Sequence, residues 1–230
     1  HDIRTPINGI RGMVEIGDRC PEDMARQADC RKKIWEASTL LLELVNEVLD
    51  MGKLESGEVV LESVPFDLPE LMHEITDVLE KQAAERGIVL HREYGKLPHP
   101  RLVGSPLHVK RLLMNVLSNA IKYNRDKGRV MLDCFELSCT GDKVQICFVC
   151  ADTGIGMSEE FQKRMFEPFT QENAGARSVY GGTGLGMSIT KSLVDKMGGT
   201  IGVESRQGVG TTYTITLPFV IDSTEAAEPE

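Results

Sequence analysis

Three side chains at the start of the chain have the types and the spacing that a phosphoryl acceptor needs. His1 and Thr5 are four residues apart, which places them on one face of a helix, and Asp2 lies beside His1. A neutral imidazole is a competent nucleophile near neutral pH, and an adjacent carboxylate can orient one ring nitrogen and accept its proton. An ordinary exposed histidine on a helix surface is the alternative interpretation, and these three residues alone do not exclude it.

A second group of polar side chains follows helical spacing in the segment NVLSNAIKY. Asn115, Asn119 and Lys122 lie close to one face, so two amides and an ammonium can point together at a triphosphate and its metal. Mg²⁺ prefers oxygen ligands and keeps several waters, which suits an Asn oxygen combined with phosphate oxygens. The polar outer face of an amphipathic helix would explain the spacing equally well.

Two glycine-rich segments carry further candidates. In DTGIGM, Asp152 comes directly after a predicted strand, where its carboxylate can accept a hydrogen bond from an adenine amino group. Gly154 and Gly156 allow the backbone to turn sharply there. In GGTGLGM, residues 181–187, the glycines open a predicted helix, whose N-terminal amides can bind an anion. Ordinary glycine turns would explain the glycines but not the position of the acid.

These segments resemble, in the same order, the motifs of sensor histidine kinases of two-component systems. HDIRTPINGI is similar to the phosphoacceptor box of that family. The resemblance implies that His1 is phosphorylated, that Asp2 assists, and that Thr5 orients water when the response regulator is dephosphorylated. Pro6 stands where that box has its proline.

NVLSNAIKY is similar to the asparagine box of these kinases and of their ATPase relatives. The resemblance implies that Asn119 binds the metal and that Asn115 and Lys122 contact phosphates or metal-bound water. Tyr123 is then expected to line the nucleotide pocket. DTGIGM resembles the adenine-recognition motif of the family, with Asp152 in that role.

FEPFTQ followed by ENAGARSVY resembles the phenylalanine box and the ATP lid. Phe166 and Phe169 are expected to anchor a loop that closes over nucleotide, and Arg177 is expected to contact the γ-phosphate. Related kinases often carry two basic residues just before the tyrosine and glycines, where this chain has Ser178 and Val179. The last glycine box implies five more cofactor-binding residues: Gly182, Thr183, Gly184, Leu185 and Gly186.

A helical hairpin is predicted to carry His1. Apolar residues recur at helical spacing over residues 1–19 and again over 23–54, with a break near Pro21 and a stop at Gly57. Pro6 is expected to kink the first helix. The apolar stripe is broader than one partner helix can cover, which favours a homodimer in which two hairpins form a four-helix bundle.

The rest of the chain mixes strands and helices, which indicates an α+β fold. Predicted strands cover 59–67, 87–94, 129–138, 143–151, 200–205 and 211–219, and predicted helices cover 68–85, 106–123, 158–165 and 192–197. We predict a dimerisation and phosphoacceptor hairpin over 1–57, then an α/β sandwich with a mixed sheet over 58–221. By resemblance this sandwich is a Bergerat-type ATP-binding domain. A disordered acidic tail is expected over 222–230.

Composition limits the environment and the partners. The net charge of −9, from 35 acidic and 26 basic residues, argues against nucleic acid as the main partner. No stretch approaches the roughly 20 apolar residues of a membrane span, so this piece is expected not to cross a membrane. Six cysteines show no disulfide framework, and the pair Cys147 and Cys150 falls in a predicted strand with opposite facing. Free thiols in a reducing cytoplasm are expected.

The resemblance implies a protein-histidine kinase that uses ATP and Mg²⁺ to phosphorylate His1 and passes the phosphoryl group to a response-regulator receiver domain. Phosphatase activity toward that regulator is expected as well. A nucleotide-binding scaffold with weak or no kinase activity is the alternative that the altered lid favours. A non-kinase ATPase of the same superfamily would lack HDIRTP on a helical hairpin. The chain begins at His1 without an initiator Met, so a fragment is expected, and the resemblance implies the cytosolic portion of a membrane-attached sensor.

Overall fold

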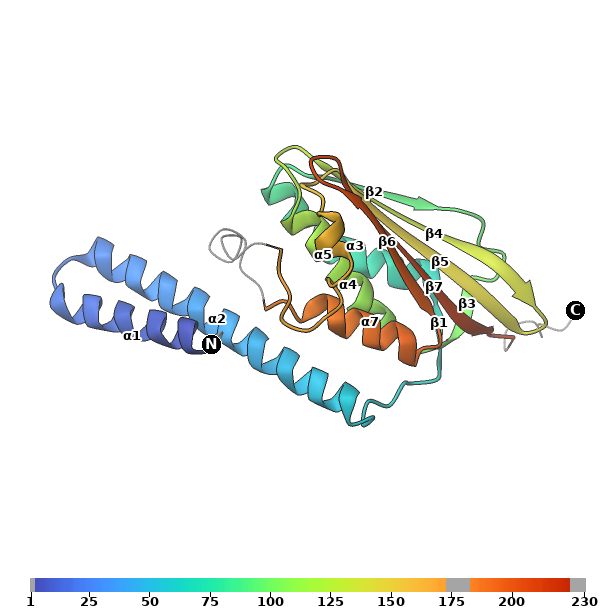
Figure 1. Ribbon diagram of the computed structural model, residues 1–230, viewed down its shortest axis with the longest axis horizontal. Coiled ribbons are helices and arrows are strands. Elements are labelled where there is room, and N and C mark those ends of the chain that lie inside the picture. The colour runs from blue at the N-terminus through green and yellow to red at the C-terminus, as the bar shows by residue number, and fades with distance from the viewer. Residues whose placement is uncertain (1–2, 173–182, 224–230) are drawn as a thin grey trace, which may run out of the picture.

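The computed structural model describes residues 3–172 and 183–223 (Figure 1). The helices are α1 Arg4–Arg19, α2 Met24–Glu55, α3 Leu68–Glu85, α4 Pro106–Lys122, α5 Glu159–Gln162 and α7 Gly186–Lys196. The strands are β1 Val64–Asp67, β2 Val89–Tyr94, β3 Arg101–Gly104, β4 Arg129–Thr140, β5 Lys143–Asp152, β6 Thr200–Arg206 and β7 Gly210–Ile221. The described part of the chain contains no helix with the length and apolar character to cross a membrane.

Helices α1 and α2 form the predicted antiparallel hairpin, which projects from the rest of the molecule (Figure 1). Asp23 caps α2 by accepting a hydrogen bond from the Arg26 amide at 3.0 Å. The Gln27 side chain donates to the Gly17 carbonyl at 2.6 Å, which fixes the turn between the helices. Pro6 lies in the first described turn of α1, where a backbone N–H has no partner within the helix.

Seven strands of the described chain form one sheet, and this sheet is mixed, as predicted. The order is β1-β3-β7-β5-β4-β2, with β6 paired to β7. Only the β2–β4 pair among these is parallel. Helices α3, α4 and α7 cover one face of the sheet (Figure 1). This arrangement confirms the α+β expectation.

The core lies between the sheet and these helices. Alternate residues of β5 face the helices because side chains alternate along a strand: Val144, Ile146, Phe148 and Cys150 are all buried. They meet the apolar face of α4. Cys147 is also buried but lies outside this cluster, which agrees with the predicted opposite facing. All six cysteines are free thiols, as expected.

Some predicted element bounds were wrong. The strand predicted over 59–67 is only Val64–Asp67, because only those residues have ladder partners on β3. Strand β3 itself was missed, since four residues next to Pro100 give too short a pattern. Helix α7 begins at Gly186, within the glycine box that was predicted to open a helix and six residues before the bound given for that helix. Most of the acidic tail, 224–230, lies outside the described residues.

Candidate functional site

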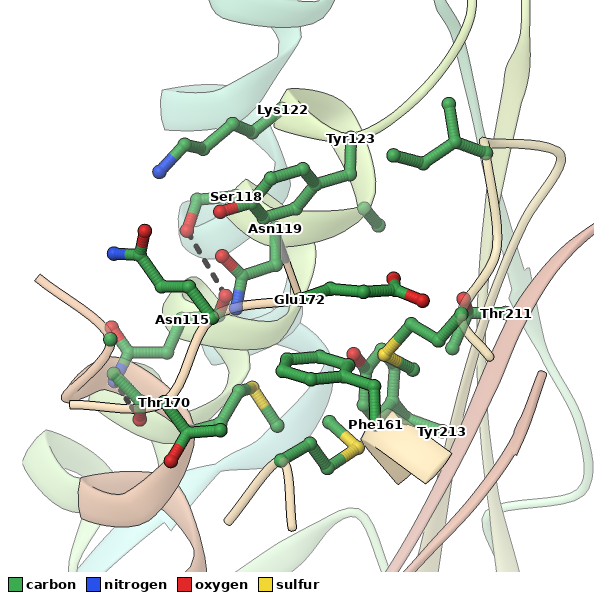
Figure 2. Close-up of a pocket in the computed structure, with 18 of the residues that line it drawn as sticks. Asn115, Ser118, Asn119, Lys122, Tyr123, Phe161, Thr170, Glu172, Thr211 and Tyr213 are labelled. Atoms are coloured by element: carbon green, nitrogen blue, oxygen red, sulfur yellow. Dashed lines mark hydrogen bonds between the residues drawn. The ribbon is translucent and has the colours of Figure 1, made fainter. Parts of the chain in front are cut away.

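A cavity of about 420 Å³ lies beside α4 at the end of β5 where Asp152 stands (Figure 2). Its volume is within the range of small-molecule sites. All four residues predicted from α4 line it, because their spacing places them on one helix face: Asn115, Asn119, Lys122 and Tyr123. The structure therefore brings the asparagine segment and the acid of DTGIGM to one place.

Asp152 is fixed by the backbone of two other segments. Its Oδ1 accepts hydrogen bonds from the Gly154 amide at 2.7 Å and from the Thr211 amide at 3.3 Å. Burial raises the pKa of the Asp152 carboxyl to about 6, although these two hydrogen bonds and the charge of Arg125 act in the opposite direction. Oδ2 accepts neither of these two bonds, so it keeps its capacity to accept a hydrogen bond.

The two glycines of DTGIGM are required by close packing. A Cβ on Gly154 would lie 2.4 Å from the Tyr123 carbonyl oxygen. Gly156 has φ +65°, and a Cβ there would lie 2.0 Å from the Arg206 carbonyl oxygen. The Ile155 amide also donates to the Tyr123 carbonyl at 3.0 Å. The turn is thus clamped between the end of α4 and the β6–β7 turn. Gly156 lines the cavity, whereas Gly154 lies behind it.

The last glycine box reaches the cavity only in part. Thr183, Gly184 and Gly186 line it. Leu185 instead lies in a small buried cluster with two residues of α7. Phe169, expected at the lid, is 53% exposed and lies outside the cavity lining. Arg177 and Gly182 are outside the described residues, as are His1 and Asp2, while Thr5 lies exposed in the first turn of α1.

Polar side chains of α4 differ in how they are held. The Asn115 amide nitrogen donates to the Gly186 carbonyl at 3.3 Å and to the Thr190 hydroxyl at 3.4 Å. These bonds tie α4 to the start of α7 and leave the Asn115 side-chain oxygen as an acceptor. Burial lowers the pKa of the Lys122 ammonium, which lies 5.1 Å from the centre of the Tyr123 ring. The lining thus offers amide oxygens and one cation.

Helix α2 also contributes to the cavity, which sequence patterns did not reveal. Glu43 and Glu47 line it. The Glu47 carboxylate accepts a hydrogen bond from the Thr183 hydroxyl. Burial raises the pKa of Glu47, and the Thr183 hydrogen bond partly offsets that effect. The sequence feature that could have indicated this contribution is a pair of acidic residues four positions apart on a leucine-rich helix. The same pattern also fits a solvated face.

The face of α2 that carries Glu43 and Glu47 also packs against the sheet domain beside the cavity. Asp50 forms an ion pair with Arg111 of α4. Met51 and Leu54 pack against the cluster that contains Leu185. Since residues 43, 47, 50, 51 and 54 share one helical face, this docking positions the two glutamates in the cavity wall. The described structure therefore has two acidic groups where a triphosphate would need positive ones.

The rest of the lining was not predicted. It consists of Ser118, Ala120, Ile155, Met157, Phe161, Met165, Thr170, Gln171, Glu172, Met187, Thr211 and Tyr213. Figure 2 shows that these side chains come from several segments around α4. Phe161 and three methionines supply an apolar, adaptable wall that suits a flat ring. Met157, Phe161 and Met165 lie in one segment and Met187 lies on α7, so the fold brings them to α4 from two places in the sequence.

Comparison with known proteins identifies the class of the site. Residues 104–221 match the family described as histidine kinase-, DNA gyrase B-, and HSP90-like ATPase, and residues 1–57 match the His Kinase A (phospho-acceptor) domain. The chain therefore belongs to the histidine kinases, and its two matched parts are the catalytic core of a sensor histidine kinase.

Individual relatives agree with this assignment. The chain is 37% identical over 217 residues to Sensor histidine kinase GacS of Pseudomonas protegens, covering 94% of this chain and 23% of that protein. It is 34% identical over 213 residues to Signal transduction histidine-protein kinase BarA of Escherichia coli K12, covering 93% of this chain and 23% of that protein. For Sensory/regulatory protein RpfC of Xanthomonas campestris pv. campestris the identity is 35%, covering 96% and 30%. The chain thus spans less than a third of these relatives.

Solved structures share the fold. The crystal structure of full-length ShkA in complex with AMPPNP has a TM-score of 0.72 and 27% identity, covering 96% of this chain and 45% of that one. ThkA in complex with the response regulator protein TrrA also has a TM-score of 0.72, with 24% identity, covering 95% and 59%. Both comparisons extend over the hairpin and the sheet domain.

We expect Glu47→Gln to strengthen binding of ATP by about threefold to tenfold at low salt. The amide can still accept the Thr183 hydrogen bond, but the negative charge that faces the triphosphate is removed. Titration calorimetry at two ionic strengths measures the effect, which should shrink at high salt. Glu36→Gln on the exposed part of α2, where Glu36 pairs with Lys32, is the matched control. Equal or weaker ATP binding by Glu47→Gln would contradict this account of the cavity charge.

Proposed function

We propose that this chain binds ATP with Mg²⁺ in the cavity, transfers the γ-phosphoryl group to His1, and then passes it to an aspartate of a response-regulator receiver domain. The observation that supports this most strongly is the convergence of the α4 amides and Asp152 on one cavity. The chain that carries this cavity also carries a phosphoacceptor domain at its start.

Adenine would be recognised at the Asp152 end of the cavity. Backbone amides already hold Oδ1 of Asp152, so its other oxygen can accept a hydrogen bond from the adenine amino group. Phe161 and Met157 provide apolar surface for the ring. The backbone packs so closely at positions 154 and 156 that only glycine fits there. This close packing holds the wall in place.

Phosphates and the metal would lie along α4. Asn119 and Asn115 offer amide oxygens of the hard type that Mg²⁺ prefers, and Lys122 offers a cation for phosphate. The residues present therefore fit a Mg²⁺ site completed by phosphate oxygens and water. Bound Mg²⁺ would neutralise charge on the triphosphate and so offset Glu47 and Glu43 as well.

The transfer itself needs His1 and its neighbours. One ring nitrogen of His1 attacks the γ-phosphorus, the bond from that phosphorus to the bridging oxygen breaks, and ADP leaves. Asp2 orients the ring and accepts the proton from the other nitrogen. Since the helix that continues the hairpin docks on the sheet domain through Asp50 and Arg111, we infer that this docking sets how the γ-phosphate is presented to His1.

Two kinds of protein partner fit the hairpin. Trp35, Leu42 and Leu49 of α2 are seven residues apart and are 76%, 61% and 56% exposed, which is the pattern of a helical dimer seam. We therefore propose a homodimer through α1 and α2. A receiver domain is the second partner, and ThkA was crystallised with such a response regulator protein. Thr5 would orient water for the phosphatase reaction toward it.

A cytosolic location follows from the need for ATP and a receiver domain. The relatives are sensor kinases several times longer than this chain. We propose that this core is the cytosolic part of such a sensor.

Incubation with γ-labelled ATP and Mg²⁺ should label the chain with phosphate that is labile in acid and stable in base, as expected for phosphohistidine. His1→Gln should reduce the label to background because the nucleophile is lost. Phosphorimaging of acid-treated and base-treated gels measures the result. Label that persists in His1→Gln would disprove the assignment of His1.

Asn119→Ala serves as the companion variant, because it leaves His1 intact and alters only the cavity. It should lose the label while circular dichroism shows the same fold. A folded, unlabelled His1→Gln together with a fully labelled Asn119→Ala would contradict the metal role of Asn119.

ATP affinity should fall by about fivefold between pH 6 and pH 5. The ionised Asp152 carboxylate accepts the adenine hydrogen bond, and the pKa of about 6 means that protonation removes this acceptor as the pH drops. Affinity therefore falls as the pH falls, because full affinity requires a pH above the pKa of Asp152. Asp152→Asn cannot titrate at this position, so in that variant the loss of affinity that Asp152 causes should be absent, while the phosphate groups and Glu47 still contribute to the pH profile. Identical profiles for the two proteins would refute the proposed role.

A further inference from the structure

A second group of metal-binding side chains lies far from the nucleotide cavity. The donor atoms of His99, Glu136 and Cys139 all lie within 4.8 Å of one another. From this geometry we propose that these three residues form a Zn²⁺ site. It is separate from the ATP site, because it lies by the β4–β5 turn, whereas Asp152 ends β5 (Figure 1). Ten strand residues correspond to about 30 Å.

A β-bulge brings two of the ligands together. Glu136 and Cys139 are three residues apart on β4, a spacing that would place them on opposite faces of a regular strand. The register on β5 shifts between Glu136 and Ser138, so one extra residue is inserted there. The shift moves Cys139 onto the same face as Glu136. A regular strand would not form this group.

The third ligand is held by a short rigid loop. His99 lies between Pro98 and Pro100, whose rings restrict the backbone on both sides. The Pro100 carbonyl accepts a hydrogen bond from the Leu68 amide at 2.9 Å, and the Lys96 carbonyl accepts one from the Glu136 amide at 3.0 Å. The His99 ring is therefore positioned by the backbone before any metal binds.

His99 and Glu136 already interact. The ring Nδ1 of His99 lies 3.0 Å from Oε2 of Glu136, whose side chain is only 9% exposed. A nearly buried carboxylate needs a cationic or hydrogen-bonding partner. An ordinary His–Glu pair would satisfy that need without Cys139. Such a pair does not explain why the exposed thiol of Cys139 lies beside it.

The set of donors favours Zn²⁺ over Mg²⁺. One imidazole nitrogen, one carboxylate oxygen and one thiolate are typical zinc ligands, and water can take the fourth position. Mg²⁺ prefers oxygen ligands alone, so the metal of the nucleotide site would not compete here. Binding would displace the protons from the thiol and from the ring nitrogen that bonds the metal. The Cys139 thiol donates a weak hydrogen bond to the Gly141 carbonyl at 3.7 Å, and it would exchange this bond for the metal.

Co²⁺ titration of the whole chain tests the proposal. The protein should carry no polyhistidine tag, and the buffer should contain no nucleotide, because both bind metals. A near-ultraviolet thiolate-to-Co²⁺ band should saturate at one equivalent and should be displaced by Zn²⁺. Cys139→Ser should abolish the band, and His99→Gln should weaken Co²⁺ binding at least about tenfold.

Cys20→Ser is the matched control, because Cys20 is the other cysteine that is not buried and it lies in the helical hairpin. It should leave the band unchanged. Circular dichroism checks that each variant folds, which is expected because Cys139 is exposed. Absence of the band in the wild type, or a band that Cys139→Ser leaves unchanged, would overturn the proposal. Unaltered Co²⁺ affinity in His99→Gln would do so as well.

Discussion

The cavity proposed to bind nucleotide depends on a single anchored carboxylate. Asp152 ends the central strand β5, and the amides of Gly154 and Thr211 fix one of its oxygens. These bonds connect the end of β5 to β7, while the turn that follows is clamped against the end of α4. The acid and the asparagines therefore keep their relative positions without a bound ligand. Such preorganisation reduces the free-energy cost of ordering the site when a nucleotide binds.

The hairpin packs against this rigid site through an interface that can change. Glu47 and Asp50 of α2 contact Thr183 and Arg111 of the sheet domain. Those contacts add negative charge to a cavity that would hold a triphosphate. Because the same helix belongs to the phosphoacceptor hairpin, we propose that nucleotide binding and the position of the hairpin are coupled through this interface. A sensor kinase core needs such a connection between its two parts.

Much of the fold was predictable because local patterns determine it. Helix α3 was predicted with the bounds that the structure has, after a strand that leads into it, and β4 and β5 were predicted as a hairpin around a Gly turn. Asn115, Asn119 and Lys122 of α4 were predicted because helical spacing fixes their common face, and Tyr123 was predicted from the family resemblance. Glu47, Tyr213 and Phe161 were missed because they reach the cavity only through tertiary contacts. The metal group at Cys139 was equally hidden, since it depends on a bulge that no local pattern revealed.

The most direct test of the central claim compares ATP with ITP, which carries a carbonyl oxygen where adenine carries its amino group. If Asp152 accepts a hydrogen bond from that amino group, the wild-type chain should bind ATP at least about tenfold more tightly than ITP. Asp152→Asn should narrow this difference, because an amide can also donate to the ITP carbonyl. Equal affinities for ATP and ITP in the wild-type chain, measured by titration calorimetry, would contradict the account.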